Sequence, residues 1–266
     1  VVITGSVLPG AEVRAEGNVE VSQGVEAASI RTSGDLVVHG GISGLLAEKG
    51  SESRPQRSTG ESAPKIRVGG SLKAKFIVNA DVRVDNDVEV TREIVQSRVL
   101  CTGAVNVKTG RIVGGMINAL GGITVAQAGS AAGVPTVLIA GRDYRVENQV
   151  INTGSDLPAA LERMEKLQAD VKQLEAVENP TPTQAQQLAQ LRERSASLQE
   201  KMQEVNAELE RLMGPTKDRA KRRIEITRGV FPDTVLHIGY RLSKEIDENL
   251  RGPIRAHITD REIKLR

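Results

Sequence analysis

A short unit recurs along the first half of the chain and restricts its fold more than any other feature. Each copy has a turn residue, one further residue, and then β-branched or leucine residues that alternate with polar ones. The copies begin at Gly17, Gly34, Gly70, Asn86, Gly103 and Gly121. The steps between these starts are 17, 36, 16, 17 and 18 residues. Alternation with a period of two indicates strands that have one buried face, and a nearly constant step indicates a repeat architecture.

The repeat predicts a mainly β fold, a parallel right-handed β-helix, over residues 1–150. Two or three strands of about five residues would form each turn, and turns would stack about 4.8 Å apart. A long helix is excluded here, because glycine is frequent and the apolar residues recur every second position instead of every third or fourth. Hydrophobic residues make up 39% of the chain but aromatic residues only 2%. Such a composition suits a narrow core of aliphatic layers, because wide cores rely on aromatic side chains to fill their volume.

The step of 36 residues contains an insertion at about residues 47–65. This segment is polar and charged, and it includes Pro55 and Pro64. We expect a surface loop that leaves one turn of the β-helix. An insertion that is tolerated without a role is the simpler interpretation.

Residues 156–213 have a different pattern, in which apolar side chains recur every three or four residues. The first run is Leu157, Leu161, Met164, Leu167, Val171, Leu174 and Val177. The second run is Leu188, Leu191, Ser195, Leu198, Met202, Val205, Leu209 and Leu212. These are heptad seams, and the connection Asn179-Pro180-Thr181-Pro182 interrupts them because proline disfavours a continuing helix. The pattern predicts an inserted antiparallel coiled-coil hairpin.

The strand pattern resumes over residues 223–266. Ile224-Glu225-Ile226 is a predicted short strand, and Val230–Gly239 resembles the segment Val7–Val13. We therefore expect these residues to complete or cap the β-helix, because an open last turn leaves strand edges unpaired.

Charge gives one candidate docking patch. The chain has 36 Lys and Arg against 34 Asp and Glu, so its overall charge does not predict nucleic-acid binding. It has no apolar stretch of the length that a membrane helix needs. Five cations follow the hairpin and form a patch that suits an acidic partner: Lys217, Arg219, Lys221, Arg222 and Arg223. The alternative is a solvated connector whose cations favour the end of the preceding helix.

Motifs that would indicate catalysis or a cofactor are missing from the sequence. His39, His237 and His257 are isolated from one another, and Cys101 is the single cysteine. The glycine-rich stretches lack the Lys-Ser/Thr ending of a phosphate-binding loop, and the Asp85–Asp87 cluster lacks the spacing of known calcium loops. We expect no catalytic residues, no cofactor and no metal site.

Several segments resemble the bacterial flagellar assembly protein A family. They are Val7–Val21, the run from Gly34 to Ile42, and Ile112-Val113-Gly114-Gly115 followed by Gly129–Val137. The order of β-helix, coiled coil and β tail is also similar to that family. Residues 7–21 additionally resemble the C-terminal β-helix of the division inhibitor MinC, but the Arg-Gly-Arg segment of MinC has no counterpart here. The resemblance implies a cytoplasmic, non-catalytic protein that serves flagellar assembly or placement.

Two other functions compete with this interpretation. A bactofilin-like scaffold would polymerise end to end, and a polysaccharide-active enzyme would use the same β-helix but normally needs aromatic platforms. The expected partners are proteins: flagellar regulators, an ATPase of the MinD type that the resemblance suggests, or further copies of the chain. The sequence begins without a methionine or a signal peptide and within a strand-like pattern, so we expect a longer protein.

Overall fold

A computed structural model describes residues 1–44, 65–176, 181–213, 223–240, 242–259 and 262–265. The chain forms two compact units. One comprises residues 1–144 and 217–266, and the other comprises residues 145–216.

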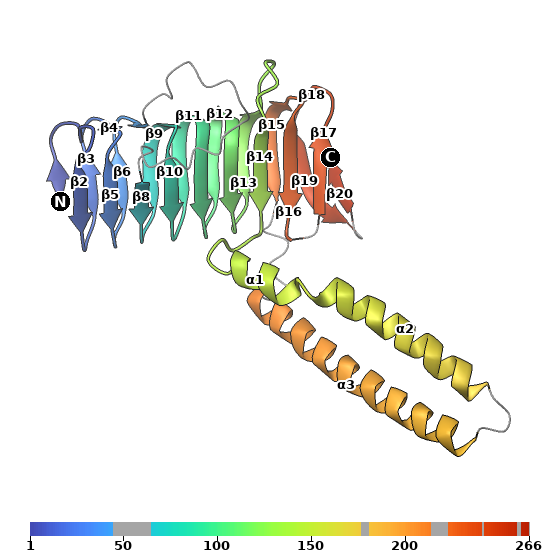
Figure 1. Cartoon of the computed structure of the whole chain (residues 1–266). Coiled ribbons are helices and arrows are strands. Elements are labelled where there is room, and N and C mark those ends of the chain that lie inside the picture. Colours follow the sequence, from blue (N-terminus) through green and yellow to red (C-terminus); the bar gives the residue numbers. More distant parts are fainter. Residues whose placement is uncertain (45–64, 177–180, 214–222, 241, 260–261, 266) are drawn as a thin grey trace, which may run out of the picture. The chain divides into compact units, whose positions relative to one another are not determined.

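The first unit is a β-solenoid of about seven turns, as the sequence predicted. Strands of successive turns pair in parallel and lie side by side (Figure 1). Their pairings form three walls. The first wall contains β1 (Val2–Ile3), β3 (Val19–Val21), β6 (Leu36–Val38) and the first halves of β9 (Leu72–Val78), β11 (Val88–Cys101), β12 (Val105–Ala119), β13 (Ile123–Ala128) and β15 (Ile224–Val230). The second wall contains β4 (Val25–Glu26), β7 (Ile42–Ser43) and the continuations of those longer strands. The third wall contains β2 (Glu12–Ala15), β5 (Ser29–Thr32), β8 (Lys65–Val68), β10 (Asp81–Val84), the ends of β11 and β12, then β14 (Thr136–Ala140) and β16 (Thr234–Ile238).

Aliphatic ladders fill the core of the solenoid. Along the second wall the stacked inward residues are Val25, Ile42, Ile77, Ile94, Ile112, Ala128 and Val230. All seven are fully buried. Because aliphatic residues occupy the same position in successive turns, their side chains contact one another and are removed from water together. The narrow aliphatic core that the composition predicted is therefore confirmed among the described residues.

The last turn of the solenoid is followed by antiparallel strands. β17 (Leu242–Ile246) pairs with β16, while β18 (Leu250–Arg251) and β19 (Ile254–Thr259) pair with β15. β20 (Glu262–Leu265) then pairs with β19. These pairings satisfy the backbone groups of the last parallel turn, which would otherwise present a bare strand edge.

The second unit consists of three helices. They are α1 (Glu147–Gly154), α2 (Leu157–Glu175) and α3 (Pro182–Met213), and α3 packs against both others. α2 and α3 are the inserted pair of packed helices that the heptad pattern predicted. α1 was not predicted: the strand region was expected to run to residue 150, whereas β14 ends at Ala140. Val150 of α1 is buried, and α1 packs against α3. This packing outweighs the preference of valine for strands.

Two details of the helical pair differ from the sequence prediction. The heptad pattern predicts Leu161 on the seam, but its side chain is 51% exposed, and the neighbouring Ala160 is partly buried. The sequence predicts Pro182 in the connection between the helices, whereas it is the first residue of α3. Proline is well tolerated there because the first amides of a helix have no partner within it. Thr181 caps this end: Gln184 N–H donates to Thr181 Oγ1 (3.3 Å) and Thr181 N–H donates to Gln184 Oε1 (2.8 Å).

Candidate interaction surface

Four arginines lie in register on the outside of the third wall. They are Arg14 of β2, Arg31 of β5, Arg67 of β8 and Arg83 of β10, and each faces the next across a parallel strand pair. The four strands stand side by side in consecutive turns, coloured blue to teal in Figure 1. Arg14, Arg31 and Arg67 are exposed, whereas Arg83 is half-buried. We call these four residues the arginine ladder.

Carboxylates contact the ladder at its two ends. Arg14 Nη2 lies 2.7 Å from Glu12 Oε1, and Asp81 Oδ1 lies 3.7 Å from Arg83 Nε. Asp81 also approaches Arg98 Nη1 at 3.9 Å. The two central residues, Arg31 and Arg67, have no ion pair with any residue that the structure describes. The middle of the ladder therefore carries uncompensated positive charge.

The ladder departs from the rule that the rest of the solenoid follows. In the other described strand pairs, Asp or Glu residues that face Lys or Arg in register give pairs of opposite sign. On the first wall Lys73 Nζ lies 3.3 Å from Glu89 Oε2, and on the second wall Arg111 Nη2 lies 2.8 Å from Glu93 Oε2. Like charges directly opposite each other destabilise a strand pair. Four arginines in one column are therefore a cost to the fold, which points to a role in binding.

Sequence reasoning missed the ladder, although its signal is present. Each of the four arginines stands between two apolar or small residues, three positions before the turn residue that opens the next repeat. For example, Arg14 precedes Gly17 and Arg31 precedes Gly34 by three positions. Aligning the copies of the repeat by their turn residues gives the four arginines the same position in the repeat, but it does not show which turns are neighbours across the 36-residue step.

The predicted basic patch after the hairpin falls mostly outside the described residues. Lys217, Arg219, Lys221 and Arg222 all lie there. Arg223 is exposed, and its Nε lies 3.1 Å from Glu225 Oε1. The same carboxylate oxygen lies 3.3 Å from Arg255 Nε. Arg223 is thus already paired within its own wall.

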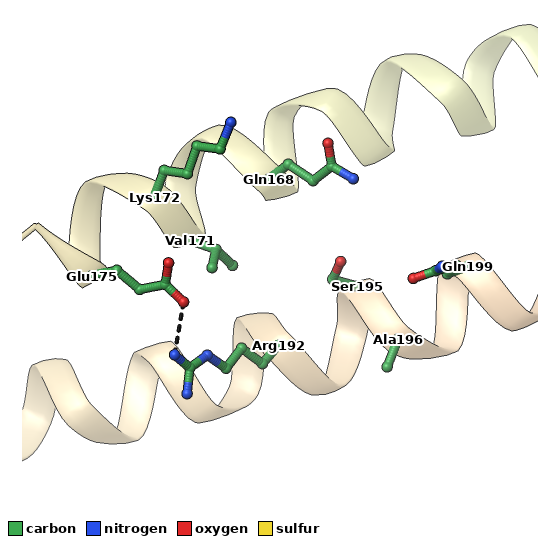
Figure 2. Close-up of a pocket in the computed structure, with 8 residues that line it drawn as sticks. All are labelled: Gln168, Val171, Lys172, Glu175, Arg192, Ser195, Ala196 and Gln199. Carbon is green, nitrogen blue, oxygen red and sulfur yellow. Dashed lines mark hydrogen bonds and ion pairs between the residues drawn. The ribbon is translucent and has the colours of Figure 1, made fainter.

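The helical unit has a hollow of about 330 Å³ between α2 and α3. Figure 2 shows Ser195 and Ala196 of α3 on one side and Gln168 and Val171 of α2 on the other. The ion pair between Glu175 and Arg192 (2.7 Å) bridges the helices beside it. The side chains of Ser195 and Ala196 are small and leave this space, which begins one turn after Met164 along α2.

The reactive side chains do not form a constellation. His39 Nε2 lies 2.7 Å from Glu20 Oε1, His237 Nδ1 lies 3.4 Å from Arg142 Nη2, and His257 is exposed to an intermediate degree. Burial lowers the pKa of His237, and the Arg142 charge adds to this effect. The described residues contain no group of three or more His, Cys, Asp or Glu that would hold a metal ion.

Cys101 is buried, and burial raises the pKa of its thiol, with the charge of Asp87 acting in the same direction. A protonated, enclosed thiol is a poor nucleophile. Among the described helices, none has both the length and the apolar character of a membrane span.

Residues 1–263 match the family model of the flagellar assembly protein A beta solenoid domain. This match covers nearly the whole chain, including the helical unit between β14 and β15. No curated protein and no solved structure matches the chain significantly.

Proposed function

We propose that this chain, which belongs to the flagellar assembly protein A family, is a non-catalytic scaffold that brings other proteins together during flagellar assembly. The observation that carries the proposal is the arginine ladder, a column of like charges on a wall whose core is closely stacked. Backbone pairing between turns fixes the spacing of the four Cα atoms, so binding requires only the side chains to become ordered.

The helical unit supplies a second surface of different character. α2 and α3 pair along a seam whose described side chains are mostly half-buried, with only Met164 and Leu209 buried. A paired-helix element with a hollow beside Val171 suits helix-mediated contacts with a partner protein. The scaffold would thus offer a charged wall and a helical element to different proteins.

The end-to-end polymer is the less favoured alternative. Polymerisation by stacking turns requires that the last parallel turn present free strand edges to the next molecule. Here β15 and β16 pair with antiparallel strands after the last parallel turn. A polymer would therefore need another kind of contact at this end.

The proposal includes a cytoplasmic location, with recruitment to the membrane or the cell pole through partners. Flagellar regulators and an ATPase of the MinD type are candidate partners by the same family relationship.

Flagellation of living cells tests the proposal. A flagellated bacterium that lacks its own member of the family would receive the gene that contains this chain, or the same gene with residues 157–213 replaced by a short flexible linker. We expect the intact gene to restore the number of flagella and the linker variant to fail while its protein accumulates to the same level. Restoration by the linker variant would argue against the helical unit as a docking element. Failure of the intact, accumulated protein would contradict the proposed function.

A further inference from the structure

We propose that the arginine ladder binds an acidic α-helix of a partner protein, which lies along the solenoid axis with carboxylates at intervals of about one helical turn. This inference rests on the proposed scaffold function and names the chemistry of one partner. Arg31 and Arg67 are the central contacts because neither has a carboxylate partner among the described residues.

Spacing favours a helix over an extended chain. Adjacent turns of a solenoid stack about 4.8 Å apart, so four registered arginines span about 14 Å. One turn of an α-helix rises about 5.4 Å, so four carboxylates on one helical face span about 16 Å. An extended strand places same-side residues almost 7 Å apart, and four of them span about 20 Å. The mismatch with the ladder is about 2 Å for the helix and about 6 Å for the extended strand, so the helix requires less displacement of the arginine side chains.

The residue type favours carboxylate recognition. All four positions carry arginine, whose planar guanidinium donates two parallel hydrogen bonds to one carboxylate. In the neighbouring outward column, by contrast, Lys65, Asp81 and Arg98 alternate in sign, as pairs elsewhere on the solenoid do. The ladder is thus a specific column and not part of a generally basic wall.

Two other anionic partners fit the wall less well. Strands β2, β5, β8 and β10 read EVRA, SIRT, KIRV and DVRV, and none contains an aromatic residue on which a nucleic-acid base would stack. Their outward side chains are Glu12 and Arg14, Ser29 and Arg31, Lys65 and Arg67, and Asp81 and Arg83. None of these is apolar, so the four ladder strands offer no side chain to insert into a bilayer, and attraction of the ladder to anionic lipid would be electrostatic alone.

Binding of designed peptides to the whole purified chain tests the inference. The probe is a fluorescent alanine-based helix with glutamates at i, i+4, i+7 and i+11, which lie on one face. The comparison peptide has the same composition with the glutamates distributed around the helix. We expect the one-faced peptide to bind at least about tenfold more tightly, a difference of one decade in Kd. Equal affinity for the two peptides would overturn the inference.

A double charge reversal locates the site. Arg31→Glu with Arg67→Glu is expected to weaken binding of the one-faced peptide by at least about tenfold. The matched control is Arg92→Glu with Lys108→Glu, which changes the net charge equally. Both control residues are exposed, at a corner where the strands have register irregularities and form no column. We expect the control to bind within about threefold of the original chain, because the remaining long-range effect is screened by salt.

Circular dichroism would first establish that both variants keep the strand spectrum of the original chain. Loss of binding in the control as well as in the ladder variant would show bulk electrostatics and overturn the inference. The inference would also be overturned if phosphatidylserine vesicles or a single-stranded oligonucleotide bound more tightly than the one-faced peptide and the ladder variant lost that binding. These results are independent of flagellation, so failure of this inference would leave the scaffold proposal to its own test.

Discussion

Ser97 and Gly115 face each other in adjacent turns so closely that no side chain fits between them. A Cβ atom on Gly115 would lie 2.2 Å from the carbonyl oxygen of Ser97, and the φ angle of Gly115 is +79°. Ser97 is fully buried, and its hydroxyl accepts a hydrogen bond from the Ala80 amide and donates one to the Val95 carbonyl. The backbones of the two turns therefore leave no room for a side chain at position 115.

Replacing Gly115 should strongly destabilise the solenoid. We expect Gly115→Ala to lower the free energy of unfolding of the solenoid by about 3 kcal/mol, because it combines left-handed strain with a backbone clash. Gly10→Ala is the matched control, since Gly10 has the same φ of +79° and no atom near its Cβ position. The control should lose about 1 kcal/mol. Urea unfolding followed by circular dichroism measures both, and equal losses would contradict the close approach.

Reversing one charge in the arginine ladder should stabilise the fold. Arg31→Glu places a carboxylate between Arg14 and Arg67, the two residues that face position 31 from the neighbouring strands. Two like-charge pairs then become opposite-charge pairs, worth about 0.5 kcal/mol in total at these exposed positions. Thermal unfolding at low salt should show the rise, and added salt should remove it. A lower midpoint at low salt would mean that the arginines do not repel one another.

The seam of the helical pair should depend on Met164 and not on Leu161. Met164 is buried, with its sulfur 3.6 Å from the Ser195 hydroxyl, whereas Leu161 is 51% exposed. We expect Met164→Ala to lower the stability of the pair by about 2 kcal/mol. Leu161→Ala should change it by less than about 0.5 kcal/mol. Thermal loss of the helical circular dichroism signal compares the two, and equal effects would place Leu161 on the seam after all.

The thiol of Cys101 should react only after unfolding. Burial raises its pKa, so at mildly alkaline pH the folded chain holds it protonated and enclosed. We expect slow modification by iodoacetamide in native buffer and rapid modification in urea, with the transition following the loss of strand signal. Mass spectrometry counts the modified fraction. Rapid modification without urea would show that the third wall opens at Cys101.

The sequence alone was sufficient for the architecture. Alternating apolar residues after each turn residue predicted the parallel turns, because a strand with one buried face needs a period of two. Heptad spacing predicted the packed helices, because apolar residues that recur every three or four positions lie on one face of a helix. Both patterns are repeated many times, so a single exception such as Leu161 did not disturb them. The capping box of Thr181 and Gln184 was also legible, and it would have placed the start of α3 correctly.

Only the tertiary structure decided which residues of different turns stand beside one another. Arg14, Arg31, Arg67 and Arg83 are separated by 16 to 36 positions in the chain, and only the stacking register brings them into one column. Likewise, α1 forms against α3, and the last turn is followed by antiparallel strands that pair with it, through contacts that no local pattern specifies. The sequence determines which side of a strand faces the core, because that depends on neighbours along the chain. The candidate surface depends on which residues of adjacent turns lie side by side. The backbone hydrogen bonds between turns determine that pairing.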